Sequence, residues 1–191
     1  MQKVISGGLV SIVCPTRRKV LVGLGGLAAY SVAPTKVKAS QSVLGMKELG
    51  FYNIHTREHG QGRFWVDGLY QEDTLENFSH LLRDHRQNLA APMDKRLYEL
   101  LYQLNKILNV SDEYHVISGY RSPKTNEMLA SKSNAVATKS YHMRGMAIDI
   151  AIPDVKLSHL RDAAISLQLG GVGYYPKSGF VHVDTGPIRQ W

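Results

Sequence analysis

The sequence has one cysteine, Cys14, and no long hydrophobic run. A single cysteine cannot close an intramolecular disulfide, and its position near the N-terminus leaves the rest of the chain without a thiol nucleophile. The longest apolar stretch, residues 20–33, is about 14 residues long, whereas a membrane-spanning helix needs about 20. These absences argue against a disulfide-stapled scaffold, a cysteine-dependent enzyme and a stable membrane span.

Acidic residues are absent from residues 1–39, which carry six Lys and Arg residues. Removing those six from the 23 basic residues of the chain leaves 17 basic against 16 acidic residues. The formal net charge of +7 therefore belongs almost entirely to the N-terminal segment. Because residues 40–191 are close to neutral, we expect no nucleic-acid-binding surface on the folded domain.

The N-terminal segment has the pattern of an export signal. Arg17 and Arg18 precede a short, glycine-rich apolar stretch, and Ala39 supplies a small residue at a candidate cleavage point. Paired arginines before a weakly hydrophobic stretch are typical of the twin-arginine route. We expect residues 1–39 to be a signal peptide, residues 40–191 to form one domain, and the mature protein to lie in the periplasm or cell envelope without stable membrane insertion. Retention as an N-terminal anchor is the alternative.

Hydrophobic patterning predicts an α+β domain. Runs rich in β-branched and aromatic residues predict an N-terminal hairpin over residues 49–55 and 63–67, with its turn around Gly60 and Gly62. Further along, helical and alternating periodicities indicate a small antiparallel sheet packed against scaffold helices. The expected helices cover residues 72–86, 93–109, 124–132 and 157–168, and the expected strands cover residues 114–118, 146–152, 171–175 and 180–185.

Asp149 is the residue that a purely structural account explains least well. It lies between Ile148 and Ile150 in an otherwise apolar strand-like run, so its carboxylate should be buried. An unpaired buried carboxylate costs several kcal/mol, and a partner is therefore expected. A metal ion is one such partner, and an ion pair with Arg121 or Arg144 is another.

Two histidines complete a set of possible metal ligands. His142 precedes Asp149 by seven residues, and His182 and Asp184 alternate with valines in a strand, so both project from one face. Two histidines and one aspartate suit a catalytic Zn²⁺, which commonly uses three protein ligands and leaves a fourth position to water. One metal would account for all three residues.

Three motifs carry a family resemblance. They are Ser-Gly-Tyr-Arg-Ser at 118–122, Ser-x-His-x6-Asp at 140–149 and His-Val-Asp at 182–184. They resemble the zinc peptidases of the D-alanyl-D-alanine carboxypeptidase, VanX and hedgehog group. Within that group the domain looks closest to the bacterial murein endopeptidase K group of proteins, including the segments at 170–176 and 184–191 and a similar leader.

The resemblance implies a function and a ligand set. It implies that His142, Asp149 and His182 hold one Zn²⁺ per chain. It implies peptidoglycan stem peptides as substrate, with hydrolysis of cross-links that include the bond between two meso-diaminopimelate residues. For Arg121 it implies a role in holding a substrate carboxylate or the tetrahedral oxyanion, a task that suits a bidentate guanidinium.

The chain departs from the family pattern at the catalytic base. Many relatives place Glu or Asp three residues before the last histidine ligand, and here that position is Gly179. Asp184 is the candidate base because it shares a strand face with His182, although orienting a metal ligand or pairing with an arginine is the alternative. A D,D- or L,D-carboxypeptidase and a catalytically silent zinc-bearing wall-binding module therefore stay open. Tyr174 and Tyr175 fit a cleft and an ordinary edge strand equally well, and we assign them no role.

Overall fold

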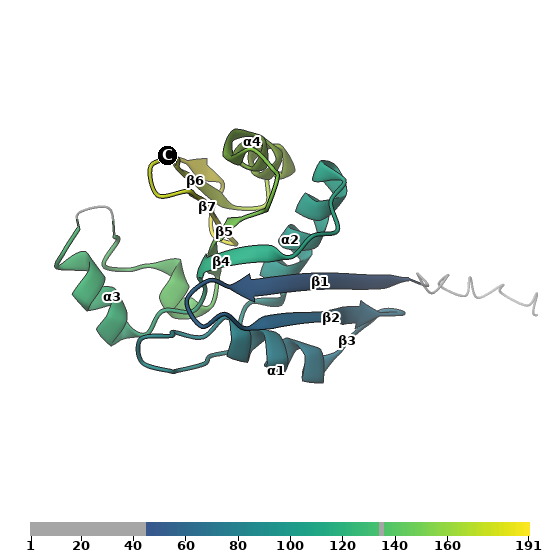
Figure 1. The fold of residues 1–191 in the computed structure, drawn as a ribbon, viewed down its shortest axis with the longest axis horizontal. Helices are drawn as coiled ribbons and strands as arrows, with labels where there is room; N and C mark the ends of the chain where they lie inside the picture. The colour runs from purple at the N-terminus through teal and green to yellow at the C-terminus, as the bar shows by residue number, and fades with distance from the viewer. Residues whose placement is uncertain (1–44, 134–135) are drawn as a thin grey trace, which may run out of the picture. The chain divides into compact units, whose positions relative to one another are not determined.

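The computed structural model describes residues 45–133 and 136–191. The predicted signal peptide, residues 1–39, lies outside the described residues. The described residues form the predicted α+β domain, with eight strands in one sheet of order β3-β2-β1-β4-β5-β7-β6-β8 (Figure 1). None of the helices in these residues has the length and hydrophobicity that crossing a bilayer requires.

The N-terminal hairpin is present, but its turn lies earlier than predicted. Strand β1 (Met46–Asn53) pairs with β2 (His59–Val66), which also pairs with the short β3 (Leu69–Tyr70). The expected turn glycines, Gly60 and Gly62, lie inside β2 instead. A Cβ on Gly62 would come within 2.8 Å of Thr74 Cγ2. These glycines therefore let a helix approach the strand closely. In the sequence alone, the same glycines look like turn residues.

The sheet is mixed and larger than the small antiparallel sheet we expected. Strand β1 runs parallel to β4 (Tyr114–Ser118), so the N-terminal hairpin extends the same sheet that carries the later strands. Parallel neighbours require a long crossover connection, which the helices between these strands supply. The register that joins the two halves pairs Phe51 with Tyr114, and this long-range pairing leaves no local pattern in the sequence.

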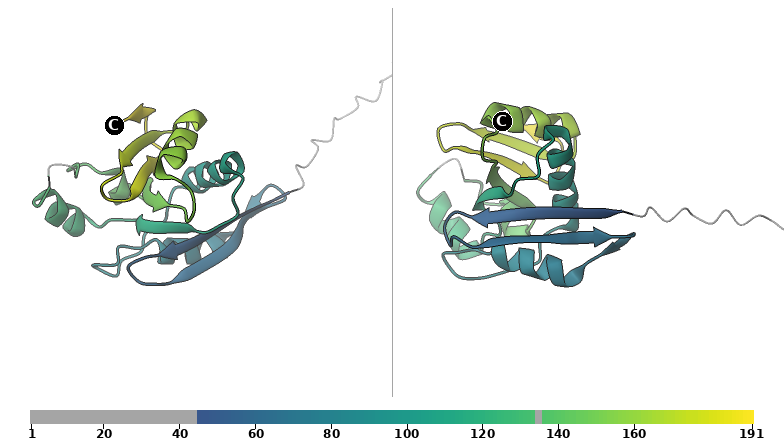
Figure 2. Two further views of the ribbon diagram at one scale, coloured as in Figure 1. Left: turned by 45° about the horizontal axis from the view of Figure 1, so that its top comes forward. Right: turned by 45° about the vertical axis from the view of Figure 1, so that its right-hand side comes forward.

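Three helices share one apolar core with the sheet. Helix α1 (Glu72–Leu81) contacts β1 and β2, α2 (Lys95–Leu108) contacts β1 and α4, and α4 (Leu157–Leu167) contacts β6 and β7 (Figure 2). The ring of Phe51 meets Phe78 of α1 at 4.9 Å between centroids and Tyr98 of α2 at 6.4 Å. One continuous core therefore forms on the helical face of the sheet.

Helix α1 ends five residues before its predicted end at residue 86. The side chain of Asp84 accepts hydrogen bonds from the backbone N–H groups of Arg86 and Gln87, and Asp84 also forms a β-bridge with Leu89. A short acidic side chain that bonds to nearby backbone competes with helix formation. The segment after Leu81 is consequently a tight loop.

The C-terminal strands separate apolar from polar residues by face. These strands are β5 (Ala147–Ala151), β6 (Gly171–Tyr175), β7 (Phe180–Asp184) and β8 (Arg189–Gln190). Ile148, Ile150, Val181 and Val183 belong to the core shared with the helices. Side chains alternate along a strand, so the intervening residues of β5 and β7 point to the opposite face of the sheet.

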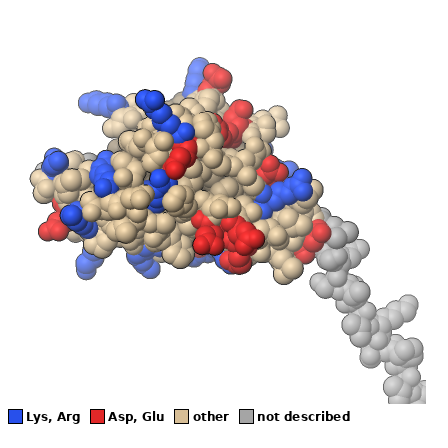
Figure 3. Space-filling model, turned by 60° about the horizontal axis from the view of Figure 1, so that its bottom comes forward, with Lys and Arg blue, Asp and Glu red and all other residues tan. Residues whose placement is uncertain are grey.

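Charged residues of both signs share the domain surface. Basic and acidic side chains are both present on the face drawn in Figure 3, where acidic residues gather near the middle and basic residues flank them. This distribution agrees with the near balance of 17 basic and 16 acidic residues in 40–191.

Candidate metal centre

A row of residues crosses four strands on the sheet face away from the helical core. The register pairs Ser118 with Asp149, Asp149 with His182, and His182 with Gly173. Directly paired residues on neighbouring strands place their side chains side by side on one face. The sheet thereby joins Asp149 to His182 across a sequence separation of 33 residues.

His142 reaches the same place from outside the sheet. It belongs to the single-turn 3₁₀ helix η1 (Tyr141–Arg144), whose N-cap Ser140 accepts a hydrogen bond from the backbone N–H of His142. Gly145 ends the turn with φ of 64° and leads directly into β5. Its backbone carbonyl accepts a hydrogen bond from Asp94 N–H, and this bond ties the turn to the start of α2.

The three predicted ligands converge. The Nδ1 of His182 lies 2.8 Å from Asp149 Oδ1, and the Nε2 of His142 lies 3.3 Å from the same oxygen and 3.2 Å from His182 Nδ1. One possible ligand atom from each residue lies within 4.8 Å of the others, and His142 and Asp149 are buried. Two imidazole nitrogens and one carboxylate oxygen at this spacing can hold a single metal ion.

Each histidine is oriented by its other ring nitrogen. His142 Nδ1 lies 2.8 Å from the backbone carbonyl of Gly119, and His182 Nε2 lies 3.0 Å from Asp184 Oδ2. A metal-binding histidine usually donates its second ring N–H to a carbonyl or a carboxylate in this way, which directs the free nitrogen at the metal. The surroundings of both histidines therefore favour ligand geometry.

The electrostatics of the cluster require positive charge among the buried carboxylates. Burial raises the pKa of Asp149, but the neighbouring histidines outweigh it and hold this pKa well below its ordinary value. Burial lowers the pKa of His142. Burial also disfavours protonated His182, yet hydrogen bonds to Asp149 and Asp184 raise its pKa to about 9. Either a protonated histidine or a metal cation satisfies this demand.

Arg121 lies beside the cluster, as predicted. Its Nη2 is 3.4 Å from Asp149 Oδ2 and 3.1 Å from Ser118 Oγ, and its side chain is only 10% exposed. The backbone N–H of Arg121 donates to the carbonyl of His142. Burial lowers the pKa of the guanidinium, against the raising effect of Asp149. Of the partners that the sequence offered for Asp149, Arg121 lies beside the carboxylate, and the two possible metal ligands His142 and His182 contact the same group.

Asp184 does not face the cluster directly. Its side chain is fully buried, it contacts the Nε2 of His182 on the side away from Asp149, and its two oxygens accept two hydrogen bonds from Arg189, at 2.7 and 3.1 Å. Oδ1 also accepts from the backbone N–H of Gly186 at 2.8 Å. These contacts do not suit the general base that we expected, and they favour the alternative of an orienting partner for His182.

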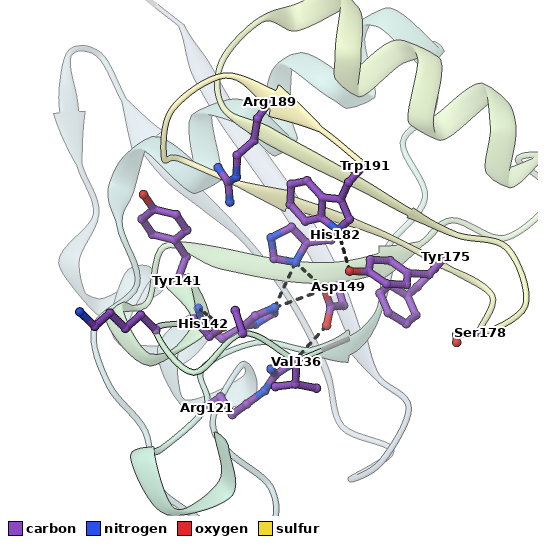
Figure 4. A pocket seen from close by; sticks show the side chains of 14 residues that line it. Arg121, Val136, Tyr141, His142, Asp149, Tyr175, Ser178, His182, Arg189 and Trp191 are labelled. Carbon is purple, nitrogen blue, oxygen red and sulfur yellow. Dashed lines mark hydrogen bonds and ion pairs between the residues drawn. The ribbon is translucent and has the colours of Figure 1, made fainter. Parts of the chain in front are cut away.

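The cluster forms part of the wall of an open pocket of about 260 Å³. Figure 4 shows Arg121, Tyr141, Tyr175, Arg189 and Trp191 arranged around His142, Asp149 and His182. Asp149 is the single carboxylate among the lining side chains that the structure describes, whereas three cations line the pocket: Arg121, Lys139 and Arg189. A substrate with carboxylate groups would meet complementary charge here.

Sequence reasoning assigned no role to three residues of the pocket, Tyr175, Arg189 and Trp191. Arg189 holds Asp184, the Trp191 ring lies 5.3 Å from the His182 ring, and the Trp191 indole N–H donates to the Tyr175 hydroxyl at 2.7 Å. Arg189 and Trp191 follow the last predicted strand, and nothing local indicates that this segment folds back beside β6 as β8. The available signal was the family resemblance of the segment at 184–191, which contains Arg189 and Trp191.

The whole domain matches a known family. Residues 41–191 match the family described as peptidoglycan L,D-endopeptidase MepK. The protein of that name from Escherichia coli (strain K12) is 41% identical over 175 residues, which cover 91% of this chain and 96% of the relative. The probable peptidoglycan L,D-endopeptidase MepK of Haemophilus influenzae is 41% identical over 172 residues, covering 89% and 92%. The comparison with solved structures returned no match.

Proposed function

The chain belongs to the peptidoglycan L,D-endopeptidase MepK family, and we propose that it is a metal-dependent endopeptidase that hydrolyses peptide cross-links of peptidoglycan. The observation that carries this proposal is the convergence of His142, Asp149 and His182 in the wall of an open, cation-lined pocket. The Escherichia coli endopeptidase is 41% identical over about nine-tenths of the chain. The family match over residues 41–191 spans all three of these residues.

We assign the metal as Zn²⁺, one per chain, with His142, Asp149 and His182 as its protein ligands. The donor set of two imidazoles and one carboxylate leaves a fourth tetrahedral position for water or substrate. The orienting partners Gly119 and Asp184 support the assignment, because they fix the ring nitrogens that do not face the cluster. Other divalent ions compete for such a site according to the Irving–Williams order, so metal analysis is part of the test.

The chain's own residues prepare the site for hydrolysis. Bound zinc would supply Lewis acidity and an acidified water. The Arg121 guanidinium, buried beside Asp149, is placed to hold a substrate carboxylate or a developing oxyanion. Asp184, fixed by the Arg189 fork, holds the orientation of His182 and is a positioning residue in this proposal. Gly179 occupies the position where many relatives have Glu or Asp. The proton acceptor is therefore a group other than Arg121, Asp184 and Arg189.

We propose a cross-link between two meso-diaminopimelate residues as the preferred substrate. The relatives are named L,D-endopeptidases, and such a cross-link carries free carboxylates close to the scissile amide. Arg121, Lys139 and Arg189 in the pocket wall match that charge, while Arg189 is already paired with Asp184. Arg121 and Lys139 are therefore the cations available to substrate.

Digestion of purified sacculi tests the function. We expect the mature protein to convert dimeric muropeptides to monomers, with loss of activity in chelator and recovery on adding Zn²⁺. Asp149→Asn keeps the shape of the side chain, removes its charge and should abolish both metal binding and turnover. Release of only a terminal amino acid would show a carboxypeptidase, and no metal-dependent change in sacculi would show a wall-binding module; either result contradicts the proposal.

We further propose that the protein acts outside the cytoplasm. Its substrate lies in the cell envelope, and residues 1–39 combine Arg17 and Arg18 with a short apolar stretch and a small residue before the domain. The sequence pattern supports export by the twin-arginine route, with the alternative of an uncleaved N-terminal anchor.

A further inference from the structure

Tyr175 lies on the same face of the sheet as His182 and lines the same pocket. It is the last residue of β6, and it lies two residues after Gly173, which pairs with His182. Residues two apart on a strand share a face, so Tyr175 points to the same side as His182. Its ring stacks on Phe180 of β7 at 4.7 Å between centroids. Two strands therefore hold the phenol ring against the pocket wall.

The hydrogen bond between Tyr175 and Trp191 has a defined donor and acceptor. The hydroxyl oxygen of Tyr175 accepts a hydrogen bond of 2.7 Å from the indole N–H of Trp191. An indole N–H can only donate, so the phenolic proton takes no part in this bond. Within residues 45–133 and 136–191 the Tyr175 hydroxyl makes no other hydrogen bond. The tyrosine thus offers a donor to whatever occupies the pocket that it lines (Figure 4).

Trp191 connects this donor to the cluster. The indole ring lies 5.3 Å from the His182 ring, and the Arg189 guanidinium lies over it at 4.9 Å from the ring centroid. Gly173 makes the position possible, because a Cβ there would come within 2.7 Å of the indole ring. The Trp191 ring is therefore fixed between the sheet and the pocket, and with it the oxygen of Tyr175.

The pocket provides few groups that can stabilise negative charge on a reacting carbonyl. Arg121 is one of them, and its Nη2 also contacts Asp149 and Ser118. Arg189 is committed to Asp184. A neutral donor in a partly enclosed site, aimed at developing charge, is among the stronger contributions that a side chain makes to catalysis.

We infer that Tyr175 is a catalytic residue whose hydroxyl donates a hydrogen bond to the oxygen of the scissile carbonyl, with Trp191 as its positioning residue. This inference rests on the proposed endopeptidase function. As the water oxygen bonds to the carbonyl carbon, the π electron pair moves onto the carbonyl oxygen and strengthens this hydrogen bond. The pair returns as the C–N bond breaks. Tyr175 keeps its proton throughout, and the protons of the water leave with the carboxyl and amine products.

Tyr175→Phe tests the inference, because it removes the hydroxyl and keeps the stacking on Phe180. We expect kcat on a soluble cross-linked muropeptide to fall by about 10- to 100-fold, with KM changed less than about twofold. The affinity for a phosphinate analogue, which carries the tetrahedral oxyanion, should fall by a similar factor. Metal content and thermal stability should match the wild type. Trp191→Phe should lower kcat less, and it should add nothing to Tyr175→Phe in the double variant.

Tyr174→Phe is the matched control. Tyr174 is the preceding residue on β6, faces away from the pocket and lies against Arg161 at 4.5 Å, so its kinetics should equal those of the wild type. If Tyr175→Phe had the kcat and phosphinate affinity of the wild type, the inference would be overturned and the proposed function would stand. A change in KM without a fall in kcat would have the same consequence. An inactive wild type would overturn the proposed function and the inference with it.

Discussion

At the scale of single residues, Asp184 shows how a charge acts through its neighbours. The fully buried carboxylate contacts the His182 ring, the Arg189 guanidinium and the Gly186 backbone N–H. Burial raises the pKa of Asp184, but its hydrogen bonds to His182 and Arg189 outweigh it and hold this pKa well below its ordinary value. A carboxylate committed in this way fixes a ligand and is poorly placed to exchange protons with substrate.

Asp184→Asn should therefore weaken metal binding more than chemistry. We expect the metal dissociation constant to rise about 10- to 100-fold, as is usual when the partner of a histidine ligand is lost. Excess metal should restore most of the turnover, measured as kcat on cross-linked muropeptide. If Asp184 were the general base, saturating metal would leave kcat low. Asp162→Asn, an exposed carboxylate on α4, is the control.

A second buried carboxylate, Asp84, holds Ser122, the residue that follows Arg121. Its Oδ2 accepts hydrogen bonds from the backbone N–H and the hydroxyl of Ser122, at 2.9 and 2.6 Å. Burial raises the pKa of Asp84, but these hydrogen bonds outweigh it and lower the pKa below the ordinary value. Ionised Asp84 therefore stabilises the fold above the unfolded-state pKa of about 4, and this stabilisation is lost as the pH falls through the lower folded-state pKa.

Asp84→Asn should destabilise the domain in a pH-dependent way. Near pH 7 we expect a loss of about 1–3 kcal/mol in the free energy of unfolding. Asp84 accepts through both oxygens, from Ser122 at Oδ2 and from the backbone N–H groups of Arg86 and Gln87 at Oδ1, whereas an amide has only one acceptor oxygen. The difference from the wild type should shrink below about pH 4. Urea denaturation at several pH values measures it. A difference that is constant from pH 7 to pH 3 would contradict the account.

At the scale of elements, the turn between η1 and β5 decides whether the ligands meet. Gly145 has φ of 64°, and a Cβ there would collide with the backbone of Pro92 and Met93 at the entry to α2. The turn can thus pack against the helix only without a side chain at this position. His142 and Asp149 lie on either side of it, so this packing sets their separation.

Two glycines allow the steric cost to be separated from the conformational cost. Gly179 also has a positive φ, 76°, but a Cβ there would meet nothing within 4 Å. Gly179→Ala should lose about 1 kcal/mol of unfolding free energy, whereas Gly145→Ala should lose about 2–4 kcal/mol. Gly145→Ala should also weaken metal binding, as titration would measure. Equal losses in the two variants would contradict the proposed role of the close contact.

At the scale of the whole molecule, the metal should stabilise the fold. The proposed ligands come from η1, β5 and β7, and the unfolded chain cannot hold them together. Metal at about 100 times its dissociation constant should add about 3 kcal/mol of unfolding free energy and raise Tm by about 5–10 °C. Calorimetry with and without chelator measures this shift. Asp149→Asn should show almost none, and a shift of normal size in that variant would place the metal elsewhere.

The proposed export of the protein is also tested on the whole chain. Replacing both arginines, Arg17→Lys and Arg18→Lys, should leave uncleaved protein in the cytoplasm, because the twin-arginine route requires the arginine pair. Fractionation and the mass of the mature chain measure the outcome. Lys36→Gln, which changes charge outside the pair, should be exported normally. Normal export of the double variant would contradict a twin-arginine signal.

Local sequence sufficed for most elements and for the types of the ligands. Strand 114–118 was predicted at its observed bounds and helix 157–168 to within one residue, because their periodicity is strong. Asp149 could be singled out because an acid in an apolar strand needs a partner whatever the fold. Gly60 and Gly62 misled the prediction, since local sequence cannot distinguish a turn glycine from one that admits a helix.

Tertiary structure decided how these residues work. The parallel pairing of β1 with β4 and the return of the chain as β8 are long-range contacts. The free energy of forming them does not depend on the local sequence pattern. They bring Arg189 to Asp184 and Trp191 to Tyr175. The sequence by itself determined which side chains could bind a metal. Only the register of the sheet decided which of their neighbours orient them and which face the pocket, because neighbours across strands are set by pairing and not by order along the chain.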